Sequence, residues 1–164
     1  MIILIDSGNS RIKLGWLDLQ HPTSQREPTI IAVDKLELDA LNDWIIALPS
    51  RPQWALGVNV AGEPRAAAIS TLLQQHGCMV QWIHAQAQTL GLANRYKEHA
   101  QLGPDRWVSL LGVLSHLPTQ HPPFVLASFG TATTIDTVGA DNVFVGGLIL
   151  PGSSMMRCSL AAGT

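Results

Sequence analysis

Residues 2–16 constrain the fold of this chain more than any other stretch. Four apolar residues, Ile2 to Ile5, form the short run expected of a strand buried on both faces, and the run ends at Asp6. Gly8 and Asn9 follow as turn residues, and apolar side chains then alternate with polar or small ones. The pattern predicts a strand, a tight turn and a second strand, with a carboxylate at the first strand's end.

This turn has the chemistry of a polyphosphate site. A tight turn of this kind points backbone N–H groups into one concavity, and the hydroxyls of Ser7 and Ser10 and the ammonium of Lys13 follow closely in the sequence. Asp6 adds the hard oxygen ligand that Mg²⁺ takes when waters and substrate phosphates hold it. An ordinary hairpin with a solvated Asp is the alternative for one isolated motif.

Composition limits the classes of protein to which this chain can belong. The chain has 164 residues, of which 46% are hydrophobic and 13% charged, which is enough for one domain or one and a part. A net charge of −2, with no basic run, gives no support for direct nucleic-acid binding. No stretch has the roughly 18 apolar residues of a membrane span. Cys78 and Cys158 form no C-x-x-C pair, so a reducing, cytoplasmic location is expected.

The middle of the chain alternates strand-like and helix-like segments. Apolar runs predict strands at 29–33, 54–60 and 80–83, and the spacing of apolar residues over 41–48 predicts a helix. A second helix is expected after Gly62, with Gly77 as its C-cap. The order predicts a mixed α/β sheet with helices on both faces. Residues 86–101 fit neither pattern and are left unassigned.

A helix is expected to begin at Pro104, because apolar residues recur at helical spacing from Trp107 onward. Asp105 and Arg106 would lie in its first turn. Asp105 is a candidate to accept a proton from a substrate hydroxyl, and Arg106 is a candidate to bind a substrate carboxylate through two hydrogen bonds. The alternative is that these residues only start the helix.

The plan of the opening hairpin recurs near the end of the chain. Three prolines in residues 117–123 predict a linker, and a strand, a turn at Gly130 and a second strand follow. Gly130 follows Ser128 as Gly8 follows Asp6, which indicates an internal duplication. Two such hairpins facing each other across a cleft would bind one nucleotide from both sides.

Four motifs in order carry a resemblance to a known family: D-S-G-N-S-R-I-K, L-G-P-D-R-W, S-F-G-T-A-T-T-I-D and G-G-L-I-L-P-G. The chain resembles the type III pantothenate kinases over residues 6–152. The resemblance implies a duplicated, ribonuclease H-like fold of the actin-type ATPases. It places the first domain at 1–118, a linker at 119–123 and the start of an incomplete second domain at 124–164. That second domain would have three strands and no covering helix, as in a fragment of a longer protein.

The resemblance also implies the reaction, which is ATP-dependent phosphorylation of pantothenate, the first step of coenzyme A biosynthesis. Asp105 would be the proton acceptor, Thr131 would contact ATP, and Asp6 would lie near Mg²⁺. The first phosphate loop would comprise Asp6, Ser7, Gly8, Asn9, Ser10, Arg11, Ile12 and Lys13. The pantothenate site would be lined by Tyr96, Gly103, Pro104, Asp105 and Arg106.

Two further implications concern a cation and a partner subunit. Many family members have Asp at the position of Ser128, where it helps to bind a monovalent cation, so the resemblance predicts little dependence on potassium or ammonium here. Family members form homodimers, and the partner completes the pantothenate pocket. Two other functions stay open at this point: a nucleotide-binding accessory factor for transcription, and another small-molecule kinase or a phosphatase of the same superfamily.

Overall fold

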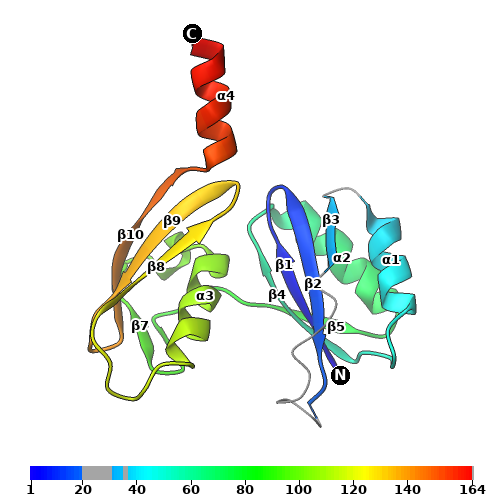
Figure 1. The fold of residues 1–164 in the computed structure, drawn as a ribbon. Coiled ribbons are helices and arrows are strands. Elements are labelled where there is room, and N and C mark those ends of the chain that lie inside the picture. Colours follow the sequence, from blue (N-terminus) through cyan, green and yellow to red (C-terminus); the bar gives the residue numbers. More distant parts are fainter. Residues whose placement is uncertain (20–30, 35–36, 164) are drawn as a thin grey trace. The chain divides into compact units, whose positions relative to one another are not determined.

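The computed structural model describes residues 1–19, 31–34 and 37–163, with the backbone alone for 31–34. The chain forms two compact units, Met1–Ile83 and His84–Thr164, and each is described by itself (Figure 1). The elements of the first unit are β1 (Ile2–Ser7), β2 (Arg11–Leu17), β3 (Ile31–Asp34), α1 (Leu38–Ile46), β4 (Trp54–Asn59), α2 (Glu63–Gln75) and β5 (Met79–Trp82).

The first unit contains a five-stranded sheet in the order β3-β2-β1-β4-β5. β2 is antiparallel to both β1 and β3, whereas β4 runs parallel to β1 and to β5. The hairpin predicted at the start of the chain is therefore confirmed, and its first strand is the centre of the sheet. The strand predicted at 29–33 is observed at 31–34, and residues 29 and 30 lie outside the described part.

The two helices of the first unit pack on one face of this sheet. Their buried residues share one hydrophobic core with the inward side chains of β1 and β2: Ile3, Ile5, Ile12 and Leu14 from the strands, Leu41 and Ile45 from α1, and Ile69 and Leu73 from α2. Leu4 and Asp6 point to the other face, because side chains alternate along a strand. Within the described residues of this unit, the expected helical cover on both faces is wrong.

A glycine terminates α2 and turns the chain into β5. Gly77 has φ of +74°, and its N–H donates to the carbonyl of Gln74 while the N–H of Cys78 donates to that of Leu73. This pair of bonds is a Schellman motif, which satisfies carbonyls at a helix end and favours glycine at the left-handed residue. The helix end predicted from Gly77 is confirmed. Cys78 is buried in the same core, and this burial raises the pKa of its thiol.

The second unit contains its own five-stranded sheet, in the order β6-β7-β10-β9-β8. Its three long strands, β8 to β10, form an antiparallel meander. The unassigned residues 86–101 supply two short strands and a short 3₁₀ helix. The elements are β6 (Gln88–Thr89), β7 (Leu92–Asn94), η1 (His99–Gln101), α3 (Pro104–Leu114), β8 (Phe124–Phe129), β9 (Ala132–Val138), β10 (Val143–Pro151) and α4 (Ser153–Gly163).

Helix α3 packs on the sheet of the second unit. Trp107 and Leu110 are fully buried in a core with Val138 of β9 and Phe144 of β10. The expected sheet without a covering helix is therefore wrong, because α3, which the sequence places in the first domain, packs on the sheet of the second unit. The proline-rich residues 119–123 connect α3 to β8 inside one unit, and the compact units divide between residues 83 and 84.

Helix α4 contributes nothing to this core. It has no buried residue, and Met155, Met156 and Leu160 are all exposed. Figure 1 shows α4 extending from the end of β10. The strands before it also expose apolar side chains, among them Val125, Phe129, Leu148 and Ile149. Among the described helices, none is both long and apolar enough to span a membrane.

Candidate active site

The turn between β1 and β2 is held by its own backbone. The N–H of Gly8 donates to the carbonyl of Arg11 at 3.0 Å, and the N–H of Val60 donates to the carbonyl of Ser7 at 2.9 Å. The first bond closes the turn, so the N–H of Gly8 is used within the loop. The second bond fixes the end of β1 to the chain that leaves β4. The predicted phosphate loop is thus anchored on both sides.

The predicted loop residues do not all face the same way. Asn9, Ser10, Arg11 and Lys13 are exposed. Ser7 and Ile12 are buried on the helix-covered face, and the Ser7 hydroxyl has no hydrogen-bond partner among the described residues. The reason is the twofold alternation of side chains along β1 and β2.

Asp6 and Lys13 face each other across the hairpin. They are direct partners in the register of β1 and β2, and Lys13 Nζ donates to Asp6 Oδ2 at 2.8 Å. No group of three or more His, Cys, Asp or Glu residues in the described part of the chain could hold a metal ion. A single exposed carboxylate nevertheless fits Mg²⁺ that is held mainly by waters and phosphates. Asp6 therefore suits a nucleotide-borne metal and not an all-protein cage.

The second predicted loop joins β8 to β9 at Gly130 and Thr131. The N–H of Gly130 donates to the carbonyl of Ala132, and the N–H of Gly152 donates to that of Thr131. A Cβ on Gly152 would lie 2.3 Å from the Gly130 carbonyl oxygen, so only glycine permits this close approach. The side chains of Thr131 and of Ser128 are exposed.

A hollow of about 500 Å³ lies beside this second turn, within the second unit. Its walls come from the turn, from the end of β10 and from the start of α4. The main lining residues are Phe129, Gly130, Thr133, Leu150, Pro151 and Met156.

The start of α3 presents the predicted substrate residues. Gly103 caps the helix and Pro104 occupies its first turn together with Asp105. The Asp105 carboxylate folds back over Gly103, where a Cβ would lie only 2.6 Å from Oδ1. Asp105 is half-buried, so its carboxylate can be reached from solvent. The helix start predicted at Pro104 is confirmed, and Gly103, Pro104 and Asp105 lie together there.

Arg106 is buried beside Asp105 and forms an ion pair with Asp136 of β9. Its Nε donates to both carboxylate oxygens of Asp136, at 3.1 and 3.2 Å, and its Nη2 donates to Oδ1. Arg106 is 8% exposed and Asp136 only 1%. The Nε–Nη2 edge of the guanidinium is therefore occupied by a protein carboxylate.

Aromatic rings complete the surroundings of this ion pair. The guanidinium carbon of Arg106 lies 6.0 Å from the ring centre of Phe144, and the ring of Tyr96 packs edge-on against Phe144 at 5.2 Å. Burial alone lowers the pKa of Arg106, but hydrogen bonds and charge attraction from Asp136, with a contribution from Tyr96, raise this pKa above its ordinary value. Tyr96 therefore lies close to Arg106 of α3.

Sequence reasoning gave no role to Asp136, although it ends one of the four motifs, or to Phe144. Asp136 lies two positions before buried Val138 on β9, so both side chains point inward and a charged residue stands at a core position. That pattern was the available signal, because a carboxylate on the core side of a strand requires a partner. Nothing local indicated that the partner would be Arg106, 30 positions earlier.

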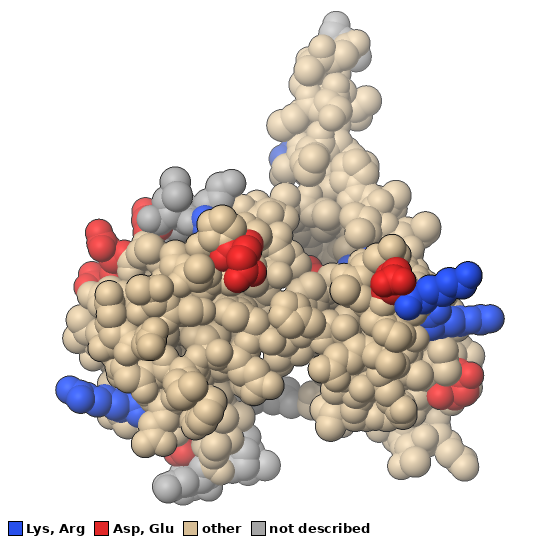
Figure 2. Space-filling model, turned by 180° about the vertical axis from the view of Figure 1, so that it is seen from behind, with Lys and Arg blue, Asp and Glu red and all other residues tan. Residues whose placement is uncertain are grey.

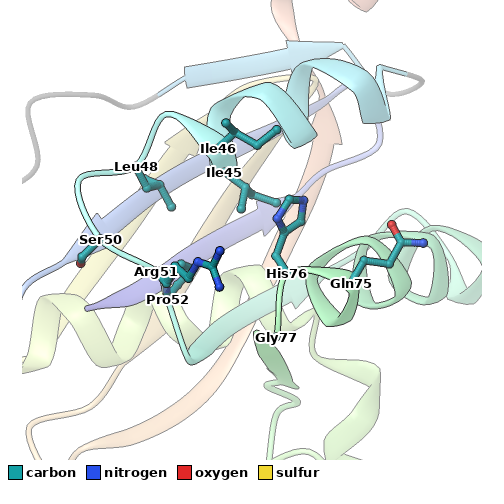
Figure 3. Close-up of a pocket in the computed structure, with 9 residues that line it drawn as sticks. All are labelled: Ile45, Ile46, Leu48, Ser50, Arg51, Pro52, Gln75, His76 and Gly77. Atoms are coloured by element: carbon teal, nitrogen blue, oxygen red, sulfur yellow. The ribbon is translucent and has the colours of Figure 1, made fainter.

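A different hollow, of about 490 Å³, lies in the first unit between the ends of α1 and α2. Figure 3 shows the guanidinium of Arg51 and the ring of His76 extending toward the same space. His76 Nε2 also lies 2.8 Å from Asn42 Oδ1. None of the predicted site residues lines this hollow. On the face in Figure 2, the Lys and Arg side chains of the described residues are scattered and form no continuous patch.

Comparisons with known proteins identify the family. A sequence model described as type III pantothenate kinase matches residues 2–164. This chain belongs to the type III pantothenate kinase family. A protein of Bordetella bronchiseptica with that name is 58% identical over 164 residues, and one of Bordetella petrii is 61% identical. Each alignment covers 100% of this chain and 61% of the relative, so the chain spans about three-fifths of their length.

A solved structure supports the fold of this pantothenate kinase family member. It is described as a "putative 2-dehydro-3-deoxygalactonokinase protein" from Sinorhizobium meliloti, and it matches with a TM-score of 0.62 at 13% sequence identity. The match covers 100% of this chain and 57% of that one. At this identity the similarity concerns the mixed α/β fold alone.

Proposed function

We propose that the protein transfers the γ-phosphoryl group of ATP to the terminal hydroxyl of pantothenate. The observation that carries this proposal is the start of α3, where a half-buried carboxylate, Asp105, stands next to a guanidinium fixed by Asp136. One group suits proton acceptance and the other suits a carboxylate, and pantothenate has both a hydroxyl and a carboxylate. Membership of the family supports the same reaction.

In this mechanism the protein positions the reactants and compensates their charge. The loop from Asp6 to Lys13 and the turn at Thr131 bind ATP, and Asp6 orients the metal. Mg²⁺, when bound, would screen the charge of the β- and γ-phosphates. Asp105 orients the attacking hydroxyl and takes its proton. Arg106 binds the substrate carboxylate, while Tyr96, Gly103 and Pro104 line the same pocket.

We also propose the wider features that accompany this activity. β10-β9-β8 repeats the antiparallel order of β3-β2-β1, which supports an internal duplication of the actin type. The exposed apolar residues of the second unit support a homodimer or further chain packed against them. A cytoplasmic location is consistent with coenzyme A biosynthesis.

The test is a phosphoryl-transfer assay on the full-length protein. Mass spectrometry should detect 4′-phosphopantothenate when ATP, Mg²⁺ and pantothenate are present, and no product when Mg²⁺ is chelated. A panel of sugars and other small alcohols should give at least tenfold lower rates, on the order of the discrimination expected from a polar pocket. ATP binding without transfer to any acceptor would favour the accessory factor for transcription instead.

A further inference from the structure

We propose that Asp136 is a positioning residue that fixes one edge of the Arg106 guanidinium and so directs the other edge toward the substrate carboxylate, and that Gly147 provides the space for this arrangement. The inference rests on the proposed function, because it concerns how the same pocket recognises its substrate. It assigns roles to two residues, in β9 and β10, that the motif pattern at the start of α3 does not contain.

The hydrogen-bond geometry determines which edge of Arg106 is free. A guanidinium has two planar edges that can each bind a carboxylate through two hydrogen bonds, Nε–Nη2 and Nη1–Nη2. Asp136 accepts from Nε and Nη2 and so occupies the first edge. The second edge carries the remaining donors of Arg106, and a side-chain hydrogen bond to Tyr96 also acts on this guanidinium. Asp136 thus decides the direction in which Arg106 presents its remaining donors.

Burial explains why Arg106 requires this partner. Its side chain is 8% exposed and lies above the Phe144 ring, so without Asp136 its charge would be buried and uncompensated. With Asp136 present, the guanidinium loses little conformational entropy when a substrate binds, because one edge is already fixed. The ion pair therefore preorganises a carboxylate-binding group in buried, low-dielectric surroundings.

Gly147 lies directly opposite Asp136 in the register of β9 and β10. A Cβ at this position would lie 2.3 Å from Asp136 Oδ1, 2.5 Å from Arg106 Nη2 and 2.6 Å from the backbone oxygen of Ile135. Two of these atoms belong to the ion pair and the third to backbone, so a side chain here has to displace the pair. The requirement for glycine is steric, because space and not φ is limiting.

The test compares two substrates in the full-length protein. Pantothenol has a hydroxymethyl group in place of the carboxylate of pantothenate, so it cannot accept two charged hydrogen bonds from the Arg106 guanidinium. We expect Asp136→Asn to lower kcat/KM for pantothenate by about 10- to 100-fold, mainly through KM, since charged hydrogen bonds are worth that much. For pantothenol the same change should alter kcat/KM within about twofold. Asp141→Asn, in an exposed turn of the same unit, is the matched control.

A second variant disturbs the pair without removing a charge. Gly147→Ala should raise KM for pantothenate, leave that for pantothenol unchanged and leave KM for ATP unchanged. Gly112→Ala is its control, because a Cβ on Gly112 of α3 meets no atom within 4 Å. This variant decides the question if Asp136→Asn fails to fold.

The outcomes separate this inference from the proposed function. Equal losses for both substrates in Asp136→Asn or Gly147→Ala would mean a merely structural role and would overturn the inference. A wild-type enzyme that phosphorylates pantothenate and pantothenol equally well would overturn it too, while leaving the kinase activity in place. A wild-type protein that phosphorylates neither would remove the proposed function and the inference together.

Discussion

At the scale of single residues, Asp6 and Lys13 form an ion pair that contributes little to the stability of the fold. Their side chains are 39% and 59% exposed, and pairs in such positions typically contribute about 0–1 kcal/mol to stability. Neither side chain belongs to the hydrophobic core under the helices. Substitutions here therefore test function with little effect on the fold.

We expect Asp6→Asn to lower Mg²⁺-dependent kcat by about 100-fold or more, because a carboxylate that orients the metal–phosphate complex is lost. Steady-state kinetics on the full-length protein measures this, and the thermal midpoint should change little. Asp39→Asn, an exposed change in the first turn of α1, is the control. An unchanged kcat in the Asp6 variant would remove Asp6 from the mechanism.

Ser128 leads to a prediction about monovalent cations. A hydroxyl offers potassium no charged ligand, and the side chain is exposed beside the second turn. Rates measured across a potassium series should therefore match those in sodium at equal ionic strength. Ser128→Asp should introduce saturable activation by potassium. If the unmodified protein already shows such activation and sodium does not replace it, other groups form the site.

At the scale of elements, α3 contributes both to the hydrophobic core of the second unit and to the proposed substrate site. Trp107 and Leu110 hold it on β9 and β10, while Asp105 and Arg106 project from its first turn. Movement of the helix on the sheet would therefore move both groups relative to Asp136. The turns of the two hairpins do not depend on packing against a sheet in this way, because each turn is closed by hydrogen bonds of its own backbone.

Two matched core substitutions test which unit contains α3. Leu110 and Leu41 are both fully buried, in the second and first units respectively. Each change to Ala should lower the free energy of unfolding by about 2–5 kcal/mol. Hydrogen exchange should show Leu110→Ala reducing amide protection in α3, β9 and β10, and Leu41→Ala reducing it in β1 to β5. If Leu41→Ala instead reduces protection of α3, the helix belongs with the first unit.

At the scale of the whole molecule, the second unit leaves several large apolar side chains exposed to solvent. Phe129 is 84% exposed, Leu148 61% and Ile149 64%, and α4 has no buried residue. Contiguous apolar surface of this kind promotes association. The relatives with the pantothenate kinase name are longer than this chain, which covers 61% of the first of them.

We predict that a polypeptide ending at Thr164 self-associates and does not phosphorylate pantothenate. The physical reason is the set of exposed apolar side chains on β8, β10 and α4 of the second unit. Light scattering after size exclusion measures the association, and the transfer assay measures the activity. A polypeptide of the relatives' length serves as the control and should be active. A monomeric, active 164-residue kinase would contradict the prediction.

Local patterns in the sequence determined much of this protein. The run from Ile2 to Ile5 and the turn at Gly8 were enough to predict the first hairpin, and Gly77 was enough to predict the end of α2. Pro104 and the apolar spacing after it predicted α3. These features depend on neighbours in the chain, because strand alternation, turn geometry and helix capping are local effects.

Other features were decided by the tertiary structure alone. Prolines at 118–123 indicated a domain boundary, yet α3 buries Trp107 against the strands that follow, so the compact units divide near residue 83. Ser7 was a candidate phosphate ligand, yet alternation along β1 buries its hydroxyl. The ion-pair partner of Arg106 is Asp136 of β9, 30 positions later in the chain. Which helix covers which sheet, and which buried charges pair, depends on contacts between distant residues, and local periodicity contains no information about them.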